Sequence, residues 1–154
     1  MNMPSPSTPI ALGAGGHWRN WVGNQSFIAR HMAAPASEDE LAALVHEASR
    51  QNLGMRVAGS GHSFTPVVAT SGLLLSLKNL QGIVSVDEKR KRVVVRAGTR
   101  IGDIGRALKQ IGLSLANQGD IDTQAIAGAL STRRKQRRAG NRDAETQGPD
   151  TRRS

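Results

Sequence analysis

The sequence predicts a domain of the α+β or α/β class, in which helices and strands are intermixed along the chain. One observation behind this is a window with apolar residues at the helical spacing i, i+3, i+4 and i+7. The other is a set of short segments, rich in valine, isoleucine or leucine, that have the length of strands. The chain has 154 residues, enough for one ordinary domain, and only 3% are aromatic, so aliphatic side chains must form most of the core.

Residues 1–16 are rich in proline, serine, glycine and alanine. We expect them to form a disordered leader, because a secretory signal would need a basic segment followed by an apolar one. The segment 17–24 then contains Trp18 and Trp21, and Phe27 follows it, so three of the four aromatic residues of the chain lie in this region. This segment either pins the N-terminus to the domain surface or contacts a ligand.

The clearest helix begins after Ser37. Ser37 and Glu40 have the spacing of a capping box, and the acidic residues between them favour the positive end of the helix dipole. We expect this helix to end at Gly54. Its apolar face would consist of Leu41, Leu44, Val45 and Ala48.

Four short segments have the composition of strands, namely residues 55–58, 73–77, 83–86 and 93–95. The segment 73–77 is almost wholly apolar, which is typical of a buried strand. The charged residues 87–91 connect the last two strands, and we therefore expect these strands to form a hairpin. A second helix, capped by Thr99 and ended by Gly112, would bury Ile101, Ile104, Leu108 and Ile111.

A glycine-rich turn directly follows the strand at 55–58. It reads Gly59-Ser60-Gly61-His62-Ser63, and we call residues 59–63 the glycine loop. Glycine permits positive φ angles and close approach of the backbone to a ligand. Successive N–H groups in such a turn form a concave site for an anion, most often a phosphate. His62 places a nucleophilic nitrogen beside this site.

Three common kinds of site do not match the glycine loop. A P-loop ends in Gly-Lys-Ser or Gly-Lys-Thr, whereas this chain has Gly61-His62-Ser63. A dinucleotide-binding fingerprint needs a third glycine where Phe64 stands. The chain has no cysteine, and its histidine and acidic residues lack the spacing of metal ligands, so no metal site is predicted.

The segment 57–64 resembles the flavin-attachment loop of the vanillyl-alcohol-oxidase-type flavoproteins, and is most similar to that of the sugar-lactone and alditol oxidases. Other family elements follow in the same order: an Asn-Trp segment at 20–24, a strand–glycine–helix element from 94–99, and a flavin-contacting stretch at 112–120 and 126–129. The resemblance covers residues 17–132. It implies an FAD-binding domain of the PCMH type, in which a small parallel β/α subdomain precedes an incomplete second α/β subdomain.

In that family the loop binds the FAD pyrophosphate through N–H groups, and its histidine is bonded to the flavin 8α carbon. The resemblance therefore implies a covalent flavin link at His62. It implies FAD contacts at Ala58, Gly59, Ser60, Gly61, His62, Ser63, Asp120, Ala125, Ile126, Ala127, Gly128 and Thr132. The reaction it implies is hydride transfer from a sugar alcohol or lactone carbon to flavin N5, with oxygen or another acceptor reoxidising the flavin. Because the substrate-facing residues of the family lie mostly further along its sequence, we expect no catalytic residue and little turnover in this chain.

The composition changes after Thr132, where family members continue with Gly-Thr-His-Gly. Residues 133–154 hold 8 of the 21 lysines and arginines but only 3 of the 12 acidic residues, and they have almost no apolar side chains. We expect them to be a disordered basic tail, because they cannot bury enough apolar surface to offset the entropy of ordering. We interpret the chain as a frameshifted or truncated gene product.

Rival interpretations remain open at this point. The basic residues 133–138 can contact nucleic-acid phosphates, but the tail has no aromatic residue for base stacking, so we expect no specific nucleic-acid partner. The chain is otherwise a flavoprotein of another substrate class, such as a cytokinin, lactate or cell-wall-precursor oxidoreductase, or an unstable fragment. No apolar run approaches the roughly 20 residues of a membrane helix, so we expect a cytoplasmic protein without a membrane partner.

Overall fold

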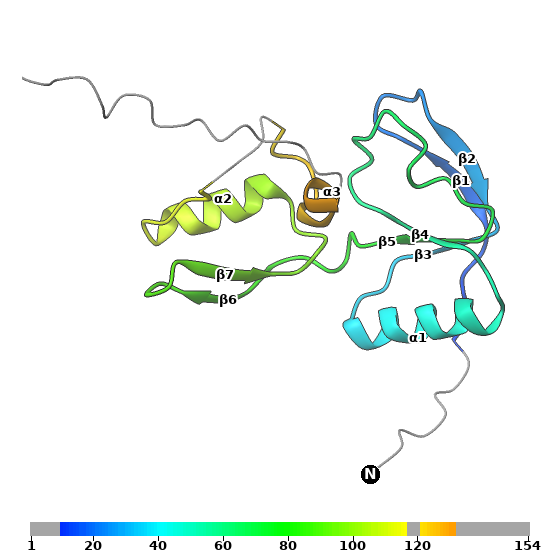
Figure 1. The fold of residues 1–154 in the computed structure, drawn as a ribbon, viewed down its shortest axis with the longest axis horizontal. Coiled ribbons are helices and arrows are strands. Elements are labelled where there is room, and N and C mark those ends of the chain that lie inside the picture. The colour runs from blue at the N-terminus through cyan, green and yellow to red at the C-terminus, as the bar shows by residue number, and fades with distance from the viewer. Residues whose placement is uncertain (1–9, 117–120, 132–154) are drawn as a thin grey trace, which may run out of the picture.

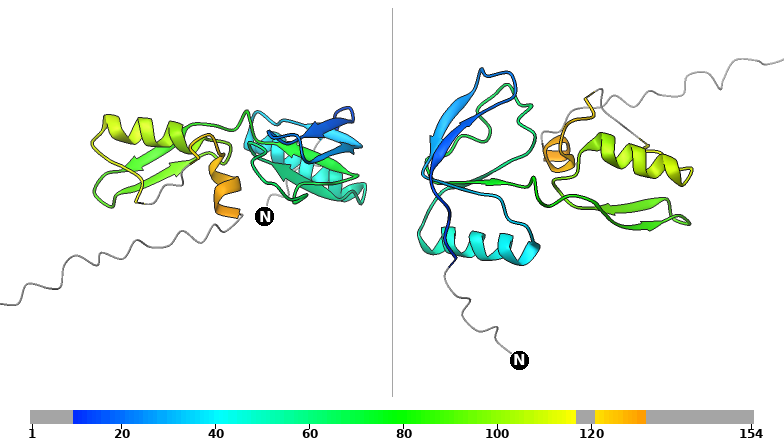
Figure 2. Two further views of the ribbon diagram at one scale, coloured as in Figure 1. Left: turned by 90° about the horizontal axis from the view of Figure 1, so that it is seen from above. Right: turned by 180° about the vertical axis from the view of Figure 1, so that it is seen from behind.

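The computed structural model describes residues 10–116 and 121–131, which form two lobes side by side (Figure 1). The first lobe contains β1 (Gly16–Arg19), β2 (Ser26–Ala29), β3 (His31–Ala33), α1 (Glu38–Arg50), β4 (Met55–Ala58) and β5 (Leu73–Ser76). The second lobe contains β6 (Ile83–Asp87), β7 (Arg92–Val95) and α2 (Ile101–Gln110). The short helix α3 (Ile126–Ser131) lies between the lobes in all three views (Figures 1 and 2). These elements confirm the predicted α+β class.

Strand β5 is the centre of the first lobe. It lies between β3 and β4 in a parallel sheet of three strands. Leu73 and Leu75 pack with the apolar face of α1, whereas Leu74 packs with Trp18 and Phe27 of the β1–β2 hairpin. All three leucines are at most 1% exposed. Because both faces of β5 are covered, the strand has a continuous apolar run instead of an alternating one.

Helix α1 begins where the sequence predicted. The Ser37 hydroxyl accepts a hydrogen bond from the Glu40 N–H (3.1 Å), and the Glu40 carboxylate accepts one from the Ala36 N–H (2.7 Å). The helix ends at Arg50, before the predicted stop at Gly54. Asn52 reverses the chain instead, with a left-handed φ of 53°.

The buried face of α1 differs from the predicted stripe at one position. Val45 is 37% exposed, whereas Glu47 is only 7% exposed. The Glu47 carboxylate accepts hydrogen bonds from Arg50 and Gln51, which neutralise its charge at the end of the helix. A polar residue therefore takes a position where periodicity predicted an apolar one.

The second lobe confirms the predicted hairpin, since β6 and β7 pair antiparallel, with a bulge between Ile83 and Ser85. The prediction that Thr99 caps α2 is wrong, because the helix begins after Arg100 and has no side-chain cap. Thr99 is buried, and its hydroxyl donates to the Arg96 carbonyl (2.6 Å) and accepts from the Gly82 N–H (3.0 Å). It thereby ties the hairpin to the turn that precedes α2.

The hairpin of β1 and β2 was not predicted. Trp18 and Phe27 lie opposite each other in it, with ring centroids 5.2 Å apart. From residue 10 onward, the expected leader is part of the fold, because Leu12 is 5% exposed in the cluster of α1 and β5. Residues 1–9 and the predicted tail lie outside the described residues.

Candidate functional site

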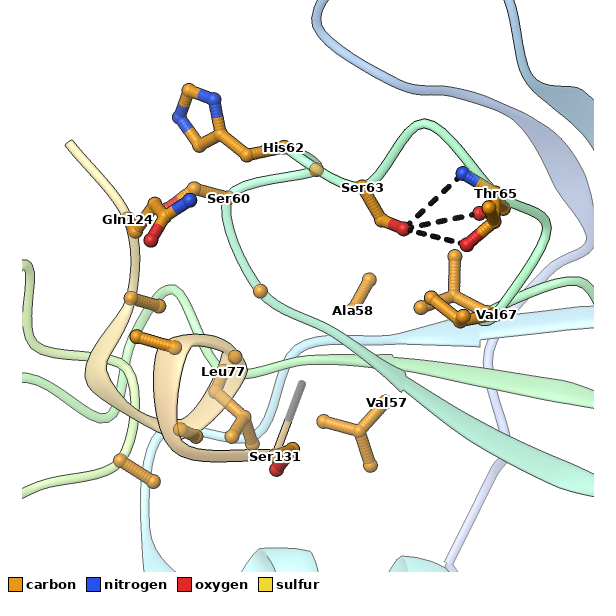
Figure 3. Close-up of a pocket in the computed structure, with 18 of the residues that line it drawn as sticks. Val57, Ala58, Ser60, His62, Ser63, Thr65, Val67, Leu77, Gln124 and Ser131 are labelled. Atoms are coloured by element: carbon orange, nitrogen blue, oxygen red, sulfur yellow. Dashed lines mark hydrogen bonds between the residues drawn. The ribbon is translucent and has the colours of Figure 1, made fainter. Parts of the chain in front are cut away.

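The glycine loop connects β4 to the chain leading into β5 and lines a cavity of about 610 Å³. The opposite wall comes from residues 124–131, which lead into and form α3, so the cavity lies between the two lobes (Figure 3). The walls are mostly apolar, with Val57, Val67 and Leu77 among the lining side chains. Among the described residues that line it, His62 is the only ionisable one, so no cation is available there to neutralise an anion.

The structure brings most of the predicted site residues together around this cavity. The predicted residues that line it are Ala58, Gly59, Ser60, Gly61, His62, Ser63, Ala125, Ala127 and Gly128. Ile126 does not line the cavity, and its N–H donates to the Thr99 carbonyl (2.8 Å), which fixes α3 to the second lobe. Asp120 and Thr132 lie outside the described residues.

Two glycines give the loop its shape. Gly61 has a left-handed φ of 72°, which a residue with a side chain rarely adopts. A Cβ atom at Gly59 would lie 3.4 Å from the Cβ of Ala125, so the loop approaches the opposite wall closely at this point. The Ser63 hydroxyl is engaged within the chain, since it bonds to Thr65 (Figure 3). Ser63 therefore offers a ligand its backbone and not its hydroxyl.

The carbonyl groups of the loop are occupied by the β1–β2 hairpin. The hydrogen bonds run from the Trp21 N–H to Gly61 (3.2 Å), from the Asn20 side chain to Ser63 (3.0 Å) and from the Gln25 side chain to Phe64 (3.2 Å). By contrast, the N–H groups of residues 60–64 donate no hydrogen bond to any residue that the structure describes. Unused N–H groups on successive residues of a turn form an anion site.

The His62 ring projects from the loop beside Ser60 (Figure 3). Its Nε2 lies 3.0 Å from the Thr123 hydroxyl, and its centroid lies 5.4 Å from that of Trp21. Its Nδ1 is buried and has no hydrogen-bond partner among the described residues. A buried polar atom without a partner is unusual in a folded protein and is a common mark of a functional group.

Sequence reasoning missed several residues that complete the site. Asn20 and Thr123 act on the glycine loop from distant parts of the chain, and Gln124 lines the cavity. Only the Asn-Trp segment had attracted attention, as either an anchor or a ligand contact, and the hydrogen bonds of its hairpin support the first. Residues 10–116 and 121–131 hold no cluster of three possible metal ligands, and none of their helices has the length and apolarity to cross a membrane.

Comparison with known proteins gives consistent results. The chain is 38% identical over 115 residues to L-gulono-1,4-lactone dehydrogenase of Mycobacterium tuberculosis, a match covering 75% of this chain and 27% of that protein. It is 34% identical over 119 residues to D-arabinono-1,4-lactone oxidase of Eremothecium gossypii, covering 75% of this chain and 22% of that protein. The chain thus spans about a quarter of the length of these curated relatives.

The fold is similar to that of cholesterol oxidase from B. sterolicum, with a TM-score of 0.66 and 24% sequence identity over 84% of this chain and 26% of that one. At this identity the likeness shows the fold alone, and it confirms the predicted PCMH-type architecture. The lactone oxidoreductases confirm the resemblance carried by the motifs. Residues 29–142 match the family described as FAD binding domain, and this range includes the glycine loop and the segment before α3. The chain therefore belongs to the family of FAD binding domains.

Proposed function

We propose that the cavity between the lobes is the FAD site and that the glycine loop holds the diphosphate. The observation that carries this proposal is the set of unused N–H groups at residues 60–64. With no cation among the described lining residues, these backbone dipoles would supply the attraction for the negative charge. The mostly apolar walls suit the ring systems of the cofactor.

We further infer that His62 is the point of covalent attachment. Its buried, unpartnered Nδ1 and its position at the end of the glycine loop support this role. The new bond would replace the ring N–H hydrogen of His62 and one hydrogen of the flavin 8α-methyl group. An external oxidant such as dioxygen would take up these two hydrogens with their electrons.

When bound, FAD supplies the capacity to accept a hydride from a carbon of the substrate. The residues described here would bind the cofactor, orient it and shield it from water, and we assign no catalytic residue among them. The names of the relatives support a sugar lactone as the class of substrate. We therefore propose that the chain is the cofactor-binding part of a sugar-lactone oxidoreductase.

Titration of the full chain with FAD, followed by the quenching of flavin fluorescence, tests the site. We expect saturable binding that ADP displaces, because ADP carries the same diphosphate. Gly61→Val should abolish binding, since valine is strained at a φ of 72° and its Cβ would press on the hairpin. The matched control is Gly54→Ala, whose added Cβ would meet nothing closer than 3.9 Å. Binding that ADP cannot displace, or that survives Gly61→Val unchanged, would contradict the proposed site.

A further inference from the structure

The loop between β1 and β2 packs against the back of the glycine loop. A Cβ atom at Gly61 would lie 3.6 Å from both the Asn20 Cα and the Trp21 nitrogen, so the two loops are in direct contact. Asn20 is the most buried polar residue of this contact, at 4% exposure. Such burial of an amide side chain is favourable only when its hydrogen-bonding groups are satisfied.

The Asn20 amide is fully used, and its orientation follows from its partners. The Nδ2 group donates to the Ser63 carbonyl (3.0 Å) and to the Asn24 side-chain oxygen (2.7 Å). The Oδ1 atom accepts from the Gln25 N–H (3.1 Å). Asn20 thus links its own hairpin loop to a residue 43 positions further along the chain.

These bonds fix the direction of peptide groups in the glycine loop. In a planar trans peptide, the carbonyl of one residue and the N–H of the next point in opposite directions. The bond from Asn20 to the Ser63 carbonyl therefore turns the Phe64 N–H away from the hairpin. The bond from the Trp21 N–H to the Gly61 carbonyl does the same for the His62 N–H.

We propose that Asn20 is a positioning residue for the cofactor diphosphate. By holding the Ser63–Phe64 peptide group, it keeps the N–H groups of the glycine loop aimed at the anion. The inference rests on the proposed FAD site. It gives the Asn-Trp segment a role beyond anchoring the N-terminus, since the hairpin determines which backbone groups of the loop stay free for a ligand.

Asn20→Asp isolates this role, because aspartate has the same shape but lacks the two N–H donors. Its carboxylate would face the Ser63 carbonyl and the Asn24 oxygen, and both contacts become repulsive. The matched control is Asn24→Asp in the same loop. Asn24 is exposed and contributes only an acceptor oxygen to Asn20, so the control adds the same charge while preserving the bond.

The experiment is isothermal titration of the full chain and both variants with FAD, ADP and adenosine. We expect Asn20→Asp to weaken FAD and ADP on the order of tenfold, because lost hydrogen bonds to buried groups have effects of this size. Any binding of adenosine, which lacks the diphosphate, should stay unchanged. Asn24→Asp should remain within about twofold of wild type for all three ligands. A merely structural role for Asn20 would weaken all three ligands in parallel.

Gln25→Glu gives a second arm if Asn20→Asp fails to fold. Gln25 donates to the Phe64 carbonyl from a more exposed position, and its glutamate variant loses only that donor. It should also weaken ADP more than adenosine. A folded Asn20→Asp variant that binds ADP and FAD as wild type does would overturn the inference while leaving the FAD site intact. A wild-type chain that binds neither ligand would overturn both.

Discussion

The hydroxyl of Thr123 lies 3.0 Å from Nε2 of His62, although the two residues are 61 positions apart. This contact joins the glycine loop of the first lobe to the segment that leads into α3. Because the neutral imidazole has one N–H, donation from Nε2 to Thr123 leaves the lone pair on the unpartnered Nδ1. An acceptor without a partner is easier to bury than a donor without one, so we infer this tautomer for His62.

Replacement of Thr123 should disturb the His62 ring without unfolding the chain. In Thr123→Val the branched shape remains but the hydroxyl is lost, so we expect a mixture of His62 tautomers and a stability loss of about 1 kcal/mol. The ¹⁵N chemical shifts of the two ring nitrogens report the tautomer directly. Thr123→Ser should restore the wild-type shifts. Identical shifts in wild type and Thr123→Val would rule out an ordering role for this bond.

A second prediction concerns Gly98, in the turn between β7 and α2. A Cβ atom there would lie 1.9 Å from the Leu77 carbonyl oxygen, so the backbone of both segments would have to move. We expect Gly98→Ala to lower the free energy of unfolding by at least about 2 kcal/mol. The control Gly54→Ala, which has open space at its Cβ, should change it by less than about 1 kcal/mol. Urea denaturation measures both, and equal effects would contradict the close contact at Gly98.

A third prediction concerns the pH dependence of stability through Glu47. Hydrogen bonds from Arg50 and Gln51 lower the pKa of this carboxyl from 4.5 to about 2. A carboxyl with a pKa lower in the folded than in the unfolded chain stabilises the fold above its unfolded pKa. The contribution of Glu47 should therefore be complete above about pH 4.5 and disappear as the pH falls towards 2.

Comparison of wild type with Glu47→Gln by urea denaturation tests this dependence. We expect wild type to be more stable at pH 7 and the difference to shrink steadily between pH 4.5 and 2. Glu88→Gln, at an exposed position in the β6–β7 turn, serves as the control for general charge effects. A stability difference that stays constant from pH 7 to pH 2 would exclude the lowered pKa as its cause.

Elements whose signals are local could be predicted from the sequence. The capping box set the start of α1, the apolar run set β5, and the charged turn set the β6–β7 hairpin. Predictions failed where a side chain is used by a distant part of the chain. Thr99 has the composition of a cap, but its hydroxyl bonds to Gly82 and Arg96. The β1–β2 hairpin is held by Leu74 and by the glycine loop, neither of which is near it in the sequence.

The same division applies to the site. The glycine loop is contiguous, so its glycines, His62 and their resemblance to flavoproteins were recognisable from the residues alone. Asn20 and Thr123 reach it across 43 and 61 positions, and a single sequence carries no signal for such contacts. Ile126 follows the family pattern but points away from the cavity, because its backbone is bonded to Thr99.

The most direct test of the proposed site is the intact mass of the full chain under denaturing conditions after incubation with FAD in air. We expect wild type to gain the mass of one FAD less two hydrogen atoms. His62→Ala should show no such gain, while His46→Ala, which removes an exposed histidine on α1, should behave as wild type. An adduct that persists in His62→Ala, or a wild-type chain whose mass does not change, would contradict attachment at His62.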